Sequence, residues 1–459
     1  MRRFHTLHLL IAALLLCAWS PALSPALAAA PAPATTAAPD MAQVVKEVAK
    51  QVEALRGWTF KQPVEKRSCT PQEALAYVKR EIQEQAPPER IGKIQAFLRT
   101  VGLLPPDCDL KKTLLDLLEE QVGGYYDTKT KALYLVERGE KMPDLVVRIL
   151  IAHELTHALD DQHVGLDAFM KSLLGQSEDL DLVATSVTEG SATSLMTQYM
   201  MRAQLSGRFD MGGLQAYAMK EAERGKVFAT APRYFSTMLA TYLCGMTFLT
   251  RGNLLAAALG DNRTVGTNLM AAAKDPPKST EQILHPEKYW DPATRDDPVV
   301  VADAAAAGML QKPGRWVVHT NTVGEMLCAI LTAPQGSQMN LLMMQMADSW
   351  TNAAAKGWGG DRFYLLASGA SAEAAGATLA DLRAVWFTLW DTETDRDEFV
   401  AAYEQQPATG RRAIVPLGSL GAVVLFGFDE AEENAVADRI KKAPPPMTRA
   451  GKPWTPWAL

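Results

Sequence analysis

The chain has little cysteine, and beyond its first thirty residues neither basic nor apolar residues form long runs. Its five cysteines in 459 residues include no Cys-x-x-Cys pair, which disfavours a cysteine-ligated zinc site. Forty-six basic and 52 acidic side chains leave a net charge of −6, without a Lys/Arg block that could follow a phosphate backbone. We therefore expect no nucleic-acid partner. A later uncharged stretch, residues 234–250, contains hydroxyl residues and a glycine, so it predicts a buried helix and no transmembrane span.

The first 28 residues have the features of a secretory signal peptide. Arg2 and Arg3 precede an uncharged run of 11 residues (9–19), and small residues suitable for cleavage follow at 26–29. A transmembrane helix needs about 20 apolar residues, so this run is too short to span a bilayer. The sequence therefore predicts an exported protein, periplasmic or extracellular.

Export changes what is expected of the remaining cysteines. Four are left after removal of Cys17, an even number in an oxidising compartment, and three pairings are possible. Pairing of nearest neighbours would join Cys69 to Cys108 and Cys244 to Cys328.

What is present is an ordinary globular composition, 48% hydrophobic and 21% charged. Apolar residues at spacings of three and four predict helices in much of the chain, whereas residues 125–136 have the pattern of a hairpin or edge strand and residues 413–426 that of a late strand. We expect an α-rich α+β fold. Its segments would be a signal peptide (1–28), a Pro/Ala linker (29–40), a helical N-terminal segment (41–118), a central region (119–300) and a mainly helical C-terminal region (301–459).

A metal-binding motif lies on the helix predicted to begin near Asp144. Residues 153–157 read HELTH, and the spacing of four places His153 and His157 one turn apart on the same helix face. Two such imidazoles can share a Zn²⁺ ion at about 2.0–2.1 Å. Zinc lowers the pKa of a bound water to about 7, and Glu154 beside the histidines is placed to accept its proton. The motif predicts hydrolysis of an amide bond.

A catalytic zinc needs a third protein ligand and an open position, and two residues are candidates. Glu189 lies on the next predicted helix among small residues, which would let its helix approach the metal helix closely. His163 has the offset of the longer H-E-x-x-H-x-x-G-x-x-H pattern, but Asp160 replaces the glycine that makes the turn. We favour Glu189 and keep His163 as the alternative.

Several motifs together resemble a family of exported bacterial zinc-peptidase-like proteins of the gluzincin type. The motifs are residues 123–127 (GGYYD), 153–163 (HELTHALDDQH), 188–192 (TEGSA) and 279–289 (STEQILHPEKY), with weaker similarity at 357–362 (GWGGDR) and 390–391 (WD). The resemblance implies a zincin-like catalytic region over 119–300, with Glu189 as third ligand. Better-known members carry an Asp four residues after that Glu to orient the first histidine. This chain has Thr193 there, so Asp160, Asp161 and Thr193 are the candidates for that hydrogen bond.

Two further features complete the expected site. Zincin folds place an edge strand above the metal helix for backbone pairing with substrate, and residues 125–136 are the candidate. A donor to the developing oxyanion is also expected, and His285 in an irregular stretch is favoured over His319, which follows a strand-like run. The sequence thus predicts a zinc metallopeptidase acting on protein or peptide substrates. The competing hypothesis is a non-catalytic exported protein with a structural or degenerate zinc site.

Overall fold

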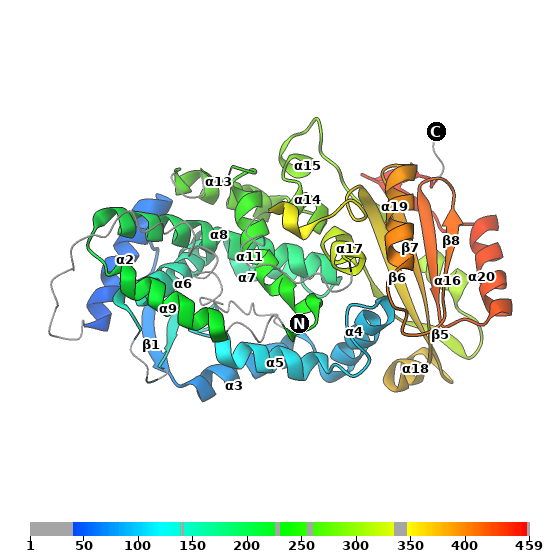
Figure 1. The fold of residues 1–459 in the computed structure, drawn as a ribbon, viewed down its shortest axis with the longest axis horizontal. Coiled ribbons are helices and arrows are strands. Elements are labelled where there is room, and N and C mark those ends of the chain that lie inside the picture. Colours follow the sequence, from blue (N-terminus) through cyan, green and yellow to red (C-terminus); the bar gives the residue numbers. More distant parts are fainter. Residues whose placement is uncertain are drawn as a thin grey trace.

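The computed structural model describes residues 40–137, 139, 142–224, 230–253, 255, 260–334 and 347–456. The expected signal peptide and all but the last residue of the linker lie outside these ranges. Helices predominate and three small sheets accompany them, so the predicted α+β, mostly α class is confirmed (Figure 1). Within the described residues, no helix combines the length and the apolar character needed to cross a bilayer.

The N-terminal segment contains four helices and one strand. They are α2 (Met41–Arg56), β1 (Glu65–Cys69), α3 (Pro71–Gln85), α4 (Pro88–Val101) and α5 (Leu110–Gln121). The side chain of Asp40 caps α2, and Thr70 forms a capping box with Glu73 at the start of α3. The presence of β1 corrects the prediction of a wholly helical segment. The sequence pattern contains no signal for this strand, because its exposed and half-buried residues do not alternate clearly.

The predicted hairpin forms β2 (Gly124–Asp127) and β3 (Ala132–Val136), joined by a four-residue turn. The strand order is β1-β3-β2, with β1 parallel to β3, so β2 is at an edge of the sheet. All four residues of β2 are nevertheless buried, and β2 packs against the metal-motif helix. The edge position in the sheet is confirmed, whereas pairing with substrate stays a prediction.

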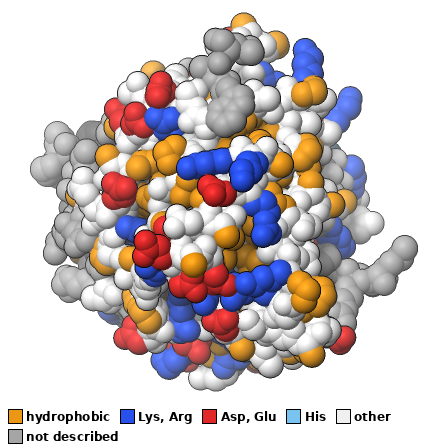
Figure 2. All heavy atoms as spheres, turned by 90° about the vertical axis from the view of Figure 1, so that its right-hand side faces the viewer, with side chains coloured by type: hydrophobic (Ala, Val, Ile, Leu, Met, Phe, Trp, Pro, Cys, Tyr) orange, Lys and Arg blue, Asp and Glu red, His pale blue; other side chains and the backbone are white. Residues whose placement is uncertain are grey.

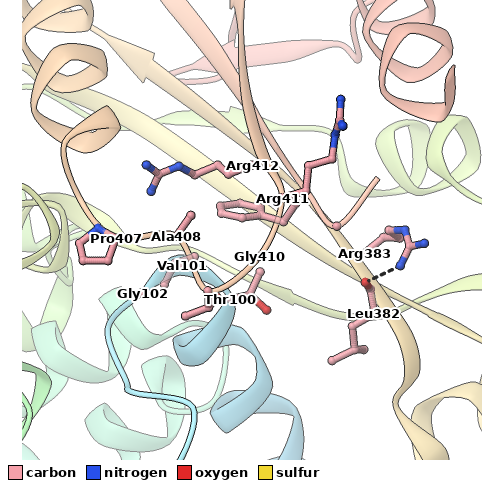
Figure 3. Close-up of a pocket in the computed structure, with 13 residues that line it drawn as sticks. Thr100, Val101, Gly102, Leu382, Arg383, Pro407, Ala408, Gly410, Arg411 and Arg412 are labelled. Atoms are coloured by element: carbon pink, nitrogen blue, oxygen red, sulfur yellow. Dashed lines mark hydrogen bonds between the residues drawn. The ribbon is translucent and has the colours of Figure 1, made fainter. Parts of the chain in front are cut away.

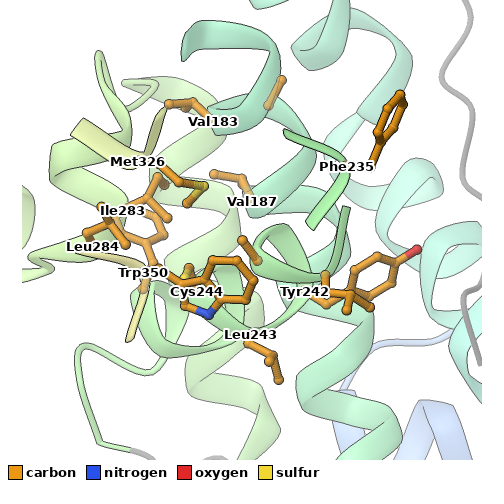
Figure 4. Close-up of a cluster of buried hydrophobic side chains, with 14 of the residues drawn as sticks. Val183, Val187, Phe235, Tyr242, Leu243, Cys244, Ile283, Leu284, Met326 and Trp350 are labelled. Atoms are coloured by element: carbon orange, nitrogen blue, oxygen red, sulfur yellow. The ribbon is translucent and has the colours of Figure 1, made fainter. Parts of the chain in front are cut away.

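The central region is almost entirely helical. It comprises α6 (Asp144–Val164), α7 (Leu166–Leu173), α8 (Glu178–Ser206), α9 (Met211–Arg224), η2 (Arg233–Ser236), α11 (Thr237–Leu249), α13 (Asn262–Lys274), α14 (Thr280–Leu284) and α15 (Glu287–Trp290). Helices α8 and α11 pack backbone against backbone, because a Cβ on Gly245 would lie 1.8 Å from the carbonyl oxygen of Ser186. Apolar side chains from α8, α11, α14 and α17 (Gly324–Thr332) meet in one buried cluster (Figure 4).

The C-terminal region is not mainly helical, as the sequence suggested, but is built on a five-stranded antiparallel sheet. Its order is β5-β6-β7-β9-β8. The strands are β5 (Arg315–Asn321), β6 (Trp358–Ser368), β7 (Ala380–Trp390), β8 (Arg412–Leu417) and β9 (Gly421–Phe426). Around it lie α16 (Asp303–Leu310), α17, η4 (Ala347–Trp350), α18 (Ala372–Thr378), α19 (Glu393–Glu404) and α20 (Glu430–Lys442). The strands β4 (Val299–Val301), β10 (Met447–Arg449) and β11 (Lys452–Trp454) form a third sheet.

Both faces of the five-stranded sheet are buried. Alternate residues of β6, such as Phe363 and Leu365, join the main core, whereas Tyr364 and Leu366 join a second core that also contains residues of α16 and α20. The outer face beyond α20 shows basic and acidic side chains intermixed (Figure 2). Glu432, for example, pairs with Lys312 and Arg315 there.

The four cysteines of the described residues are all free thiols, so the expected disulfides are not formed. Cys69 belongs to the small cluster around β1 and α3, whereas Cys244 and Cys328 are fully buried in the main core. Burial raises the pKa of both Cys244 and Cys328, which keeps them protonated and unreactive.

Candidate metal centre

The metal-motif helix α6 is buried on every side at its centre. It begins after Pro143 and ends at Gly165, whose positive φ of 76° supplies the left-handed C-cap. His153, Glu154 and His157 all have 0% exposed surface. A polar triplet in the middle of a core helix is costly unless the groups are paired or hold an ion. The burial of these residues therefore favours a metal-binding site and disfavours solvated histidines on a surface helix.

Glu189 joins the two histidines, as the sequence predicted. The Nε2 atoms of His153 and His157 lie 3.0 Å apart. The Oε2 atom of Glu189 lies 3.2 Å from the first and 3.4 Å from the second. Ligand atoms around a tetrahedral zinc at 2.0–2.1 Å are about 3.3 Å from one another. Both the donor set and its spacing therefore fit a three-ligand zinc site.

Two different contacts hold Glu189 in this position on α8. At Gly190, the next residue, a Cβ would lie 2.1 Å from the carbonyl carbon of Gly245, so α11 fixes α8 from one side. The small residues near Glu189 therefore serve the approach of α11 as well as that of α6.

On the other side, a buried polar network joins α2, α6 and α8. The carboxylate of Asp160 accepts hydrogen bonds from Arg56 at 3.1 Å and from the hydroxyl of Ser191 at 2.6 Å. Arg56 also donates to that hydroxyl at 2.8 Å, and both charged side chains have 0% exposure. This network fixes the separation of α6 and α8 close to the candidate ligands. Nothing in the sequence pattern indicated that Arg56 belongs to it.

Glu154 follows His153 directly in α6, and its side chain is fully buried. Burial raises the pKa of its carboxyl well above the usual range, and the nearby charge of Glu189 raises that pKa further. The backbone amide of Tyr126 on β2 opposes this rise, and the Cβ position of Gly124 is 3.9 Å from the Glu154 side chain. Neither carboxylate oxygen has a hydrogen-bond partner of good geometry among the described residues. The carboxylate is therefore not used by the fold.

His163, the alternative third ligand, lies outside the candidate ligand triad of His153, His157 and Glu189. Its Nε2 atom is 2.8 Å from the carbonyl oxygen of Thr59, and its ring stacks on Trp58 at 4.7 Å between centroids. His163 thus ties the end of α6 to the segment after α2.

The expected outer hydrogen bond to His153 is not formed by any of its three candidates. Asp160 belongs to the Arg56 network, and Asp161 accepts from Tyr126 and Lys131. The Nδ1 atom of His153 and the hydroxyl of Thr193 are both buried without a hydrogen-bond partner among the described residues. In this structure the first histidine is therefore oriented by packing.

The two remaining candidate histidines are placed elsewhere. His285 Nε2 lies 2.9 Å from Glu325 of α17, and none of its hydrogen bonds or ion pairs in the described residues is to the ligand triad. His319 is on β5, where its Nε2 is 3.2 Å from the side-chain nitrogen of Asn321. The structure therefore does not bring His285 together with the triad.

A polar junction connects the helical region to the five-stranded sheet. It contains the motifs at 279–289, 357–362 and 390–391. Asp179 at the start of α8 accepts from Thr280, and Asp361 accepts from the backbone of Val323 and Gly324 and from the indoles of Trp358 and Trp386. An acidic triplet of Glu281, Asp296 and Asp391 surrounds the ammonium group of Lys288. Asp296 and Asp391 also pair with Arg449, so two cations of the chain itself offset the charge of this triplet.

Glu189, one of the three candidate ligands, lines a cavity of about 330 Å³. Its lining includes Glu189 and Tyr242, and the ring of Tyr242 lies 6.0 Å from that of His153. Figure 4 shows Tyr242 and Phe235 on the side of α11 away from Ile283 and Trp350. Sequence reasoning missed Tyr242, and the one available signal was a single phenol in a helix whose other residues are apolar, threonine or glycine.

A smaller cavity of about 130 Å³ lies between the end of α4 and the five-stranded sheet. Three arginines line it, but their guanidinium groups point in different directions (Figure 3). Arg411 pairs with Glu433, Arg383 with Asp381, and Arg412 donates to backbone carbonyls. This cavity therefore has no converging cationic groups for an anion.

Comparison with known proteins gives one partial similarity. A domain of unknown function (DUF8575) matches residues 310–426. This stretch runs from the end of α16 to the end of β9, so it covers the five-stranded sheet and none of the ligand triad. No match was found among the curated proteins or the solved structures.

Proposed function

We propose that this protein is an exported zinc-dependent peptidase. The observation that carries the proposal is the convergence of His153 Nε2, His157 Nε2 and Glu189 Oε2 at 3.0–3.4 Å, next to the unused carboxylate of Glu154. Two imidazoles and a carboxylate form the three-ligand set that leaves a fourth zinc position for water or substrate.

The chemistry divides between the ion and one side chain. Zinc, when bound by these three residues, supplies Lewis acidity toward water and a peptide carbonyl. Glu154 accepts the proton that water loses as its oxygen bonds to the peptide carbon. The same carboxyl then gives that proton to the departing nitrogen as the C–N bond breaks.

A second function is favoured by a specific observation. All three ligands are at least 98% buried, and the outer hydrogen bond to His153 is not formed. Both features are compatible with a zinc ion retained for stability in a non-catalytic protein. A structural site, however, gives no role to the buried carboxylate of Glu154.

Replacing Glu154 with Gln separates the two functions. We expect this variant to keep its zinc, measured by mass spectrometry, and to lose about 10²- to 10⁴-fold of the activity on an unfolded protein substrate. The unaltered protein should lose the same activity on chelation and regain it with zinc. Equal hydrolysis by the Glu154→Gln and unaltered proteins would exclude the proposed role.

The ligand assignment has a matched pair of variants. Glu189→Ala should remove most of the bound zinc, because only two protein ligands remain. His163→Ala should retain the zinc, since its ring contacts Thr59 and Trp58 instead of the triad. Zinc loss in the His163 variant alone would assign the third ligand to that histidine.

A further inference from the structure

The cavity that reaches Glu189 runs along one face of α8. Its lining includes Glu178, Leu182, Thr185 and Glu189, which recur at spacings of three and four and so lie on one side of that helix. At a rise of 1.5 Å per residue the stripe is about 16 Å long. An extended peptide advances about 3.3 Å per residue, so the cavity matches a segment of about five residues.

The walls facing this stripe are largely apolar and come from other parts of the chain. Helices α4 and α5 contribute Ile91, Ile94, Leu114 and Leu118, and Met238 comes from α11. Ile91, Leu114 and Met238 are only partly buried, so their side chains have room for an apolar partner. The N-terminal helical segment thus forms a wall of the cavity that Glu189 also lines.

We propose that this cavity binds the apolar side chains of an extended peptide and selects which bonds are cut. This inference rests on the proposed peptidase function and adds its substrate class. Apolar lining of about 330 Å³ can enclose large aliphatic or aromatic side chains. Burial of such side chains in a pocket gives discrimination of about 10- to 200-fold per small change in size.

The lining also carries a few polar and charged groups. Glu178, Asp181, Glu189 and Lys111 line the cavity. The hydroxyl of Tyr234 donates to Glu178 at 2.7 Å, and Arg90 lies 3.7 Å from the carboxylate of Asp181. An acidic side chain of a peptide would lose its water in these largely apolar surroundings, so the cavity disfavours it.

The proposal is tested with quenched fluorescent peptides that differ at one position, which is Leu, Ala or Asp. We expect kcat/KM for the Leu peptide to exceed that for the Asp peptide at least 10-fold. Leu114→Trp fills the cavity and should lower kcat/KM for the Leu peptide about 10-fold, with unchanged zinc content. Leu205→Trp is the matched control, because Leu205 is 75% exposed and lies outside the cavity lining.

Binding gives a readout that does not depend on hydrolysis. Zinc-loaded Glu154→Gln protein should bind the Leu peptide at least 10-fold more tightly than the Asp peptide in calorimetry, and Leu114→Trp added to it should abolish that difference. Leu114→Ala, which empties the same wall, should reduce the preference for Leu if the Trp variant does not fold. Equal affinity for both peptides would overturn the inference even if the peptidase function holds. Absence of hydrolysis by the unaltered zinc-loaded protein, together with intact selective binding, would overturn the function alone.

Discussion

The contact between α8 and α11 leads to the most direct test of how the site is held. In Gly245→Ala the new Cβ would lie 1.8 Å from the carbonyl oxygen of Ser186 and 3.0 Å from the Cα of Gly190. Non-bonded carbon and oxygen atoms need about 3.3 Å, so the two helices would have to separate by about 1.5 Å. Neither partner is a flexible side chain that could move aside, because both atoms belong to the backbone.

We expect Gly245→Ala to lower the free energy of unfolding by about 3 kcal/mol or more, at the upper end of the range for overpacking. Because Gly190 follows Glu189 directly, the shift of α8 should also weaken zinc retention. Urea unfolding followed by circular dichroism measures the first effect, and zinc content after dialysis measures the second.

The control is Gly308→Ala in α16, where a Cβ meets nothing within 4 Å. Alanine is favoured over glycine within a helix, so this variant should be unchanged or up to about 1 kcal/mol more stable. If the Gly245 and Gly308 variants unfold at the same urea concentration, the two helices are not in backbone contact and the explanation of how Glu189 is positioned is wrong.

Three other variants test separate parts of the structure by urea unfolding. Arg56→Met leaves the carboxylate of Asp160 buried without its cation and should lower the free energy of unfolding by about 3–5 kcal/mol. Adding Asp160→Leu should recover part of that loss. If no stability is recovered, the ion pair is not the source of the loss. Burial, together with the charges of Lys93, Arg90 and Arg362, lowers the pKa of His319 to about 4. Protonation therefore favours the unfolded chain, and stability should fall from pH 6.5 toward pH 4, by about 2 kcal/mol at pH 5. His319→Gln should remove this part of the pH dependence, and an unchanged pH profile would contradict the burial of that ring.

Local sequence was sufficient for the features that depend on one helix. The spacing of His153 and His157 sets their separation as soon as residues 144–164 are helical, and the apolar residues of that segment predicted the helix with its glycine end. The hairpin at 124–136 was predicted for the same reason, because its turn and its strands are adjacent in the chain.

The strands β5, β6 and β7 were missed because the five-stranded sheet is covered on both faces. A strand with one exposed face alternates polar and apolar residues, whereas β6 and β7 carry apolar side chains on both sides and give no period of two. Burial on both faces is produced by α16 and α20 on one side and the main core on the other. Only the assembled fold creates that arrangement.

The candidate metal site combines residues whose proximity follows from local sequence with a residue whose position depends on tertiary packing. By itself the sequence determined the pair of histidines and the adjacent Glu154, because a helix converts their spacing directly into proximity. The choice of Glu189 over His163 was left open, since the first is 32 positions beyond His157 and its approach depends on how α8 packs. The tertiary structure places Glu189, and not His163, beside the two histidines, through Gly190 against Gly245 and through Ser191 in the network of Arg56 and Asp160. These contacts join segments up to 135 residues apart, and no local pattern encodes them.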